Sequence, residues 1–122
     1  MDERPLDSLD LLAQLVRDPG GEAVRTLAEA GTDTAWLLEQ LDGRLLGERP
    51  RGVSDELRSV IEKALIVSKD FHHTSVDWMH VLMSMLLLGS ASVAYLTEAG
   101  ADRGHLEAIL RQRLQTRRKE VN

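Results

Sequence analysis

Histidine, serine and aspartate lie close together in one stretch of the chain, where metal binding or nucleophilic catalysis are possible chemistries. His72 and His73 are adjacent, and His80 follows. A metal site needs several ligands on one face, whereas adjacent side chains point apart on most backbones. Ser75, Asp77 and His80 are triad residue types, but a triad is defined by geometry, and no strand-turn-helix nucleophile elbow is predicted around them. We expect no catalytic residue, no metal site and no cofactor, and a helix-capping role for Asp77.

Basic residues gather near the C-terminus although the chain is acidic overall. The formal net charge is −5, so a general nucleic-acid binder is not expected, because phosphate neutralisation needs a basic face. The local exception is formed by Arg111, Arg113, Arg117, Arg118 and Lys119. Cations suit the C-terminal end of a helix, and the same cluster is compatible with an anion-binding or partner-binding patch. A DNA-associated regulator that uses this basic helix is one hypothesis.

The composition indicates one soluble domain over residues 1–122. Hydrophobic residues make up 43% and charged residues 29% of the chain, as in ordinary globular proteins. Cysteine is absent, which excludes disulfides and thiolate sites. The N-terminus, MDERPLDS, lacks the apolar segment of a signal peptide, and the apolar run from Val81 to Leu88 is too short to span a bilayer. We expect a cytoplasmic protein with no membrane segment.

Helix start and stop signals predict an all-α fold of about seven helices. The first unit, residues 5–43, should hold three helices. Their expected boundaries are a start at Asp7 or Ser8, a start at Asp18 with Pro19 and an end at Gly31, and a start at Asp33 with an end at Gly43. Residues 44–53 read as a joint rich in glycine and proline.

The second unit, residues 54–119, should hold four helices, so the first unit lacks a counterpart of the leading helix. The expected N-caps of three of these helices are Ser54, Asp77 and Asp102. The leading helix of this unit carries a stripe at helical spacing, formed by Leu57, Val60, Ile61, Ala64, Leu65 and Ser68.

An internal repeat relates the two units. The stretch TLAEAGTDTAWLLEQL, which starts at Thr26, returns as YLTEAGADRGHLEAIL, which starts at Tyr95. Gly31 then aligns with Gly100 (100 − 31 = 69). Similarity at a constant offset indicates one structural unit used twice, and we expect a pseudo-two-fold double repeat.

At these residues the chain resembles the Clp N-terminal repeat domain, a helical double-repeat module found on Clp-type unfoldases and as stand-alone proteins. DSLDLLAQLVRDPGGEAVRTLAEAGTD aligns with the repeat of this family, and DWMHVLMSMLLLGSASVAYLTEAGAD aligns with one residue deleted. His80 stands at the motif histidine, and the resemblance spans about residues 5 to 115. It implies a non-catalytic module that docks substrates, adaptors or other protein partners. A Walker A glycine loop is not present in the chain, so it carries no unfoldase motor.

Two departures from the family pattern bear on function. Some family members bind phosphorylated arginine through two motif glutamates, but these positions hold Leu9 and Met79, which cannot pair with a guanidinium. The helix missing from the first unit covers apolar surface in the family. We therefore expect incomplete cover over some of Leu9, Leu12, Leu15, Val16, Trp36 and Leu37.

A helix that is apolar on nearly every side follows Asp77. Met79, Met83 and Leu87 recur every fourth residue on one face of it, and Trp78 lies in its first turn. Such a helix is either central to the core or faces a partner. Methionine repacks around varied partners, so the second reading makes these side chains, with Leu9, an adaptable protein-binding surface.

The sequence therefore favours a protein-interaction module that binds a Clp unfoldase, a Clp substrate, an adaptor or a second copy of itself. A homodimer would bury the apolar stripe against its symmetry mate. The alternative is a protein that binds a small molecule or cyclic peptide in an apolar pocket between the two units.

Overall fold

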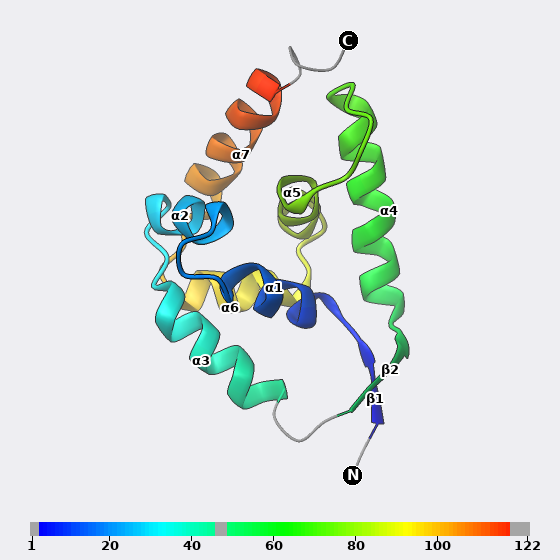
Figure 1. The fold of residues 1–122 in the computed structure, drawn as a ribbon, viewed down its shortest axis with the longest axis vertical. Helices are drawn as coiled ribbons and strands as arrows, with labels where there is room; N and C mark the ends of the chain where they lie inside the picture. The colour runs from blue at the N-terminus through cyan, green and yellow to red at the C-terminus, as the bar shows by residue number, and fades with distance from the viewer. Residues whose placement is uncertain (1–2, 46–48, 118–122) are drawn as a thin grey trace.

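The computed structural model describes residues 3–45 and 49–117, and in them the chain is mostly α-helical (Figure 1). These residues form seven helices and one two-stranded sheet. The helices are α1 (Ser8–Val16), α2 (Glu22–Glu29), α3 (Thr34–Leu45), α4 (Asp55–Asp70), α5 (Trp78–Leu88), α6 (Ala91–Glu98) and α7 (Arg103–Arg117). The prediction of an all-α fold with about seven helices is confirmed. Part of the predicted joint and the basic residues Arg118 and Lys119 lie outside the described residues.

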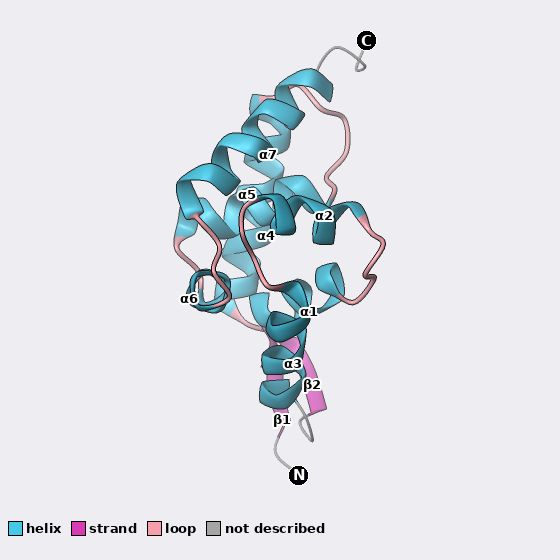
Figure 2. Ribbon diagram, turned by 90° about the vertical axis from the view of Figure 1, so that its left-hand side faces the viewer, coloured by secondary structure: helices cyan, strands magenta, loops and turns pink. Residues whose placement is uncertain are grey.

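The short sheet is a feature that the sequence analysis did not predict. β1 (Glu3–Leu6) and β2 (Arg49–Val53) pair in parallel, with Leu6 beside Val53. The amide of Ser54 also donates to the carbonyl of Leu6 at 2.9 Å. Figure 2 shows both strands at one end of the helical body. The pairing joins the stretch before α1 to the segment between α3 and α4, so it is a long-range contact with no local sequence signal.

Most helix starts follow from local capping chemistry. The Asp7 side chain accepts from the amide of Leu9 at 2.9 Å, and the Ser54 hydroxyl accepts from the amide of Leu57 at 3.0 Å. Such bonds satisfy amides that the first helical turn leaves unpaired. Asp77 caps α5 in the same way.

Two predicted boundaries are wrong. α2 begins at Glu22 after an N-cap at Gly21, and the Asp18 carboxylate instead accepts from the amide of Gly20 at 3.2 Å. Consecutive glycines disfavour helix, so the chain makes a turn there before α2 starts. α3 runs through Gly43 to Leu45, since one glycine weakens a helix without ending it.

The two glycine turns of the internal repeat contact each other. Gly31 and Gly100 both have positive φ, 88° and 98°, which favours glycine. The amide of Asp33 donates to the carbonyl of Ala99 at 2.7 Å, and the amide of Asp102 donates to that of Ala30 at 3.0 Å. This reciprocal pairing is what a two-fold relation between the units would produce, and the symmetry of the complete units stays a prediction.

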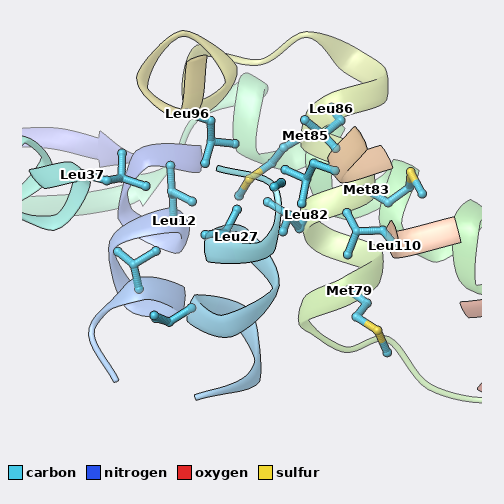
Figure 3. Close-up of a cluster of buried hydrophobic side chains, with 14 of the residues drawn as sticks. Leu12, Leu27, Leu37, Met79, Leu82, Met83, Met85, Leu86, Leu96 and Leu110 are labelled. Carbon is cyan, nitrogen blue, oxygen red and sulfur yellow. The ribbon is translucent and has the colours of Figure 1, made fainter. Parts of the chain in front are cut away.

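The core is continuous across both units and is built largely from leucine. Figure 3 shows Leu12, Leu27, Leu37 and Leu96 together, with Leu82 and Leu110 adjoining. The expected gap over the first unit is wrong. Leu9, Leu12, Val16 and Leu37 are buried, and Leu15 and Trp36 are half-buried. α1 packs against α3 and α6, which supply the cover that the missing helix was expected to provide.

α4 lies at the edge of the molecule and packs mainly on α5 (Figure 1). Its buried residues are Leu57, Val60, Ala64, Val67 and Ser68. The predicted stripe included Ile61 and Leu65, but these side chains are 44% and 48% exposed. The buried face is thus narrower than the apolar pattern suggested.

No single helix in the described ranges is both long enough and apolar enough to cross a bilayer. α5 and α6 meet these requirements only when taken together, and they are bent by 96° where they join.

Candidate binding cleft

The five residues predicted to bind a partner do not form one exposed surface. Leu9, Met79 and Met83 are 4%, 4% and 1% exposed, so these side chains do not form a continuous exposed apolar surface, as the partner-facing interpretation required. Leu87 is 42% exposed and Trp78 is half-buried. α4 and α7 both pack against α5, and α7 buries a leucine on each of three successive turns. These leucines are Leu106, Leu110 and Leu114.

α7 instead separates two hollows that expose parts of the predicted set. The larger, the α2–α5–α7 cleft, has a volume of about 720 Å³. It is lined by Glu22, Arg25, Glu29, Trp78, Met79, Ile109, Gln112, Arg113, Thr116 and Arg117. The smaller, of about 270 Å³, lies among α4, α5 and α7 and is lined by Val67, Asp70, Phe71, Met83, Leu87, Arg111 and Gln115. Trp78 and Met79 therefore open on one hollow, and Met83 and Leu87 on the other.

Three arginines surround the larger cleft in different states of pairing. Arg113 donates to the Glu29 carboxylate at 2.8 Å and to the Thr26 hydroxyl. Arg117 forms an ion pair with Asp77, the N-cap of α5. The side chain of Arg25 has no hydrogen bond or ion pair with any described residue, and it is exposed. Two guanidinium groups are thus held in place and the third is available to a ligand.

The cleft meets the N-terminus of α5, where two histidines form a buried pair. The amide of Asp77 donates to Nδ1 of His80 at 2.9 Å, so the proton of neutral His80 lies on Nε2. Nε2 is 2.7 Å from Nδ1 of His73, which accepts this proton's hydrogen bond. Burial lowers the pKa of His80, and the nearby His73 lowers it further. Both ring nitrogens of His80 are occupied, so it does not activate the hydroxyl of Ser75.

A carboxylate links the two units on another side of the molecule. Glu56 of α4 accepts from the amide and the hydroxyl of Ser8 at 2.8 and 2.5 Å, and from the amide of Ala91 at 3.2 Å. The hydroxyl of Ser92 donates to that of Ser8 at 2.7 Å. Glu56 therefore joins the starts of α1 and α6 to α4, which is a structural role.

The sequence analysis missed some residues of the cleft and singled out others only as part of the C-terminal basic cluster. Arg25 and Ile109 were not considered, because the approach of α2 to α7 is a long-range contact. Arg113 and Arg117 were noted in the C-terminal basic cluster, for which a partner-binding patch was one interpretation. Within the described ranges, no group of three or more histidine, cysteine, aspartate or glutamate residues is arranged to hold a metal ion.

The comparisons with known proteins do not assign the chain to a family. No family model matches the chain, and no curated protein matches it. The likeness to the Clp N-terminal repeat domain thus rests on the residues of the two repeated segments.

Proposed function

We propose that this chain is a non-enzymatic protein-interaction module, similar to a stand-alone Clp N-terminal repeat domain. It binds a segment of a partner protein in the α2–α5–α7 cleft. The observation that carries the proposal is the composition of this cleft, where Trp78, Met79 and Ile109 lie beside three arginines. Partially buried aromatic and arginine side chains are the residues that most often anchor protein interfaces.

The size of the cleft favours a short segment over a large flat interface. Its volume of about 720 Å³ is within the range of ligand pockets. A few side chains of an extended peptide fill such a space. Its walls come from one helix of the first unit and two of the second, so the arrangement depends on the folded core and not on a loop.

The charges favour a segment in which an acidic residue lies next to an apolar one. Arg25 is available to pair with a carboxylate, and a charge-assisted hydrogen bond of this kind is stronger than a neutral one. The apolar neighbour would contact Trp78 and Ile109. Glu22 also has no hydrogen bond or ion pair with a described residue, and it would repel an acidic residue placed nearer to it.

Selection from a random peptide library displayed on phage tests this proposal. We expect enriched peptides to combine an acidic and an apolar residue. Arg25→Glu should weaken their binding about tenfold or more, because it removes an attraction and adds a repulsion. Lys69→Glu is the matched control, since Lys69 is an exposed cation outside the cleft and the change in net charge is the same. The proposal fails if no peptide is enriched, or if both variants bind equally.

One observation also favours the alternative of small-molecule binding. The cleft lies between α2 of the first unit and α5 and α7 of the second, which is where the sequence analysis expected such a pocket. A thermal-shift screen with cyclic peptides, run on the wild type and on Ile109→Glu, separates the two functions. A ligand that stabilises only the wild type supports this alternative, and an absence of any shift removes it.

A further inference from the structure

The outward flank of α4 combines exposed apolar and charged side chains in a short stretch. Ile61 and Leu65 are one turn apart and are 44% and 48% exposed. Arg58 and Glu62 occupy the same side of the helix, because each residue advances the helix by about 100°. We call these four residues the α4 flank. None of them lines the α2–α5–α7 cleft, so this flank is separate from the proposed peptide site.

The two charged side chains of the α4 flank are unpaired within the described part of the protein. Arg58 and Glu62 are four residues apart, a spacing at which opposite charges often pair. Neither side chain has a hydrogen bond or ion pair with a described residue. One unpaired cation and one unpaired anion therefore border two exposed apolar side chains.

We propose that the α4 flank binds the α4 flank of a second copy of this chain, with the two helices antiparallel. A two-fold axis near Ile61 reverses the order of the residues in the second helix. Arg58 of each copy then approaches Glu62 of the other, and Leu65 covers the aliphatic part of the opposing Arg58. In a two-fold contact the same patch must be complementary to itself, and one cation and one anion beside a pair of apolar side chains meet this condition.

The small size of the flank sets the strength of the contact. Interfaces that bury much less than about 1,200 Å² are weak and transient. We therefore expect a weak dimer that forms at high protein concentration and dissociates on dilution. The contact should also weaken with salt, because its ion pairs lie at the surface.

Sedimentation velocity over a concentration series measures this equilibrium directly. Leu65→Glu should raise the dimer dissociation constant about tenfold or more, because it places two like charges at the contact. Ile66→Glu is the matched control. Ile66 is an exposed aliphatic residue on the same helix, 49% exposed, but it is turned by about 100° from Leu65. Circular dichroism of each variant checks that the fold is retained.

Charge reversal provides the decisive arm of the experiment. Arg58→Glu and Glu62→Arg should each weaken the dimer about tenfold, whereas the double variant should restore it to within about threefold, because the reversed pair is again complementary. The inference is overturned if the wild type is monomeric at every concentration, if Ile66→Glu disrupts as strongly as Leu65→Glu, or if the double variant is no better than the single ones. These outcomes leave the peptide cleft unaffected, since it lies on other helices.

Discussion

The central helices of the two units, α1 and α5, begin with the same hydrogen-bond arrangement but use different chemistry. In both, the N-cap aspartate accepts from the amide two residues later, Asp7 from Leu9 and Asp77 from Met79. The third helical residue returns a bond to the N-cap amide. This residue is Asp10 in α1, at 3.0 Å, and His80 in α5, at 2.9 Å.

The partners of these third residues differ, and so does their response to pH. Asp10 accepts two hydrogen bonds from the Arg4 guanidinium, at 2.6 and 2.7 Å. The bonds from Arg4 lower the pKa of Asp10. His80 donates to His73, and burial lowers its pKa, with a further contribution from His73. One helix start is stabilised by a charge, and the other requires a neutral ring.

Because of this difference, acid should destabilise the two helix starts at different pH values. A lowered pKa in the folded state gives stability that is lost on protonation. For His80 that loss begins as the pH falls below 6.5, and for Asp10 it begins only below 3.8. Burial raises the pKa of Asp7, the N-cap of α1, so Asp7 is protonated at a higher pH than Asp10. Mild acidification should therefore weaken α5 and its cleft while α1 stays intact.

The glycine turns offer the largest expected difference between the units. A Cβ at Gly100 would lie 2.8 Å from the carbonyl oxygen of Gly31, whereas one at Gly31 would lie 3.2 Å from that of Gly100. Both residues also have positive φ. We expect Gly100→Ala to lower the free energy of unfolding by about 3 kcal/mol and Gly31→Ala by about 1 to 2 kcal/mol. Urea denaturation measures both.

Gly43→Ala is the control for this pair. Gly43 lies inside α3, and a Cβ there would meet nothing within 4 Å. The change should stabilise the protein by about 0.5 to 1 kcal/mol. If Gly31→Ala proves as costly as Gly100→Ala, the two turns are equally constrained and the predicted asymmetry is absent.

Removal of the carboxylate of Asp10 tests the charged helix start. Asp10→Ala deletes the bond to the Asp7 amide and leaves the largely buried Arg4 without its two bonds to Asp10. We expect a loss of about 2 kcal/mol in the free energy of unfolding. Asp42→Ala removes an exposed ion pair with Arg17 and should change stability by less than about 0.5 kcal/mol. Equal effects of the two substitutions would show that the capping bonds contribute little.

The pH dependence of the free energy of unfolding tests the start of α5, where His80 must be neutral. Between pH 8 and pH 5.5 the wild type should lose about 1 kcal/mol of stability through His80. His80→Gln should reduce this loss, since glutamine can return the capping bond and does not titrate. His105→Gln, at an exposed position of α7, is the matched control for the loss of a histidine. Parallel wild-type and His80→Gln profiles would assign the acid response to another group.

Capping and turn chemistry could be predicted because they depend on neighbouring residues. Asp7, Ser54 and Asp77 act as N-caps in the structure as expected. Asp18 does not, because the two glycines that follow it favour a turn over a helix. Such errors are local and shift a boundary by a few residues without changing the fold.

The burial of individual side chains could not be predicted as well as helix capping, because a helix presents more apolar residues than one neighbouring helix covers. Met79 and Met83 on α5 and Ile61 on α4 each lie on an apolar stripe at helical spacing in the sequence. The two methionines are buried in α5, against which α4 and α7 pack, whereas Ile61 is 44% exposed. The cleft could not be predicted for the same reason, since it is the space left where α2, α5 and α7 meet.

By itself the sequence determined the helical class, most helix starts and the two equivalent glycine turns, because backbone capping and φ preferences act over a few residues. Tertiary structure alone decided the pairing of β1 with β2, the division of the apolar helix α5 between core and two hollows, and the placement of Arg25 and Trp78 on the same cleft. These features join residues that are far apart along the chain, and their free energy comes from packing that no short segment encodes.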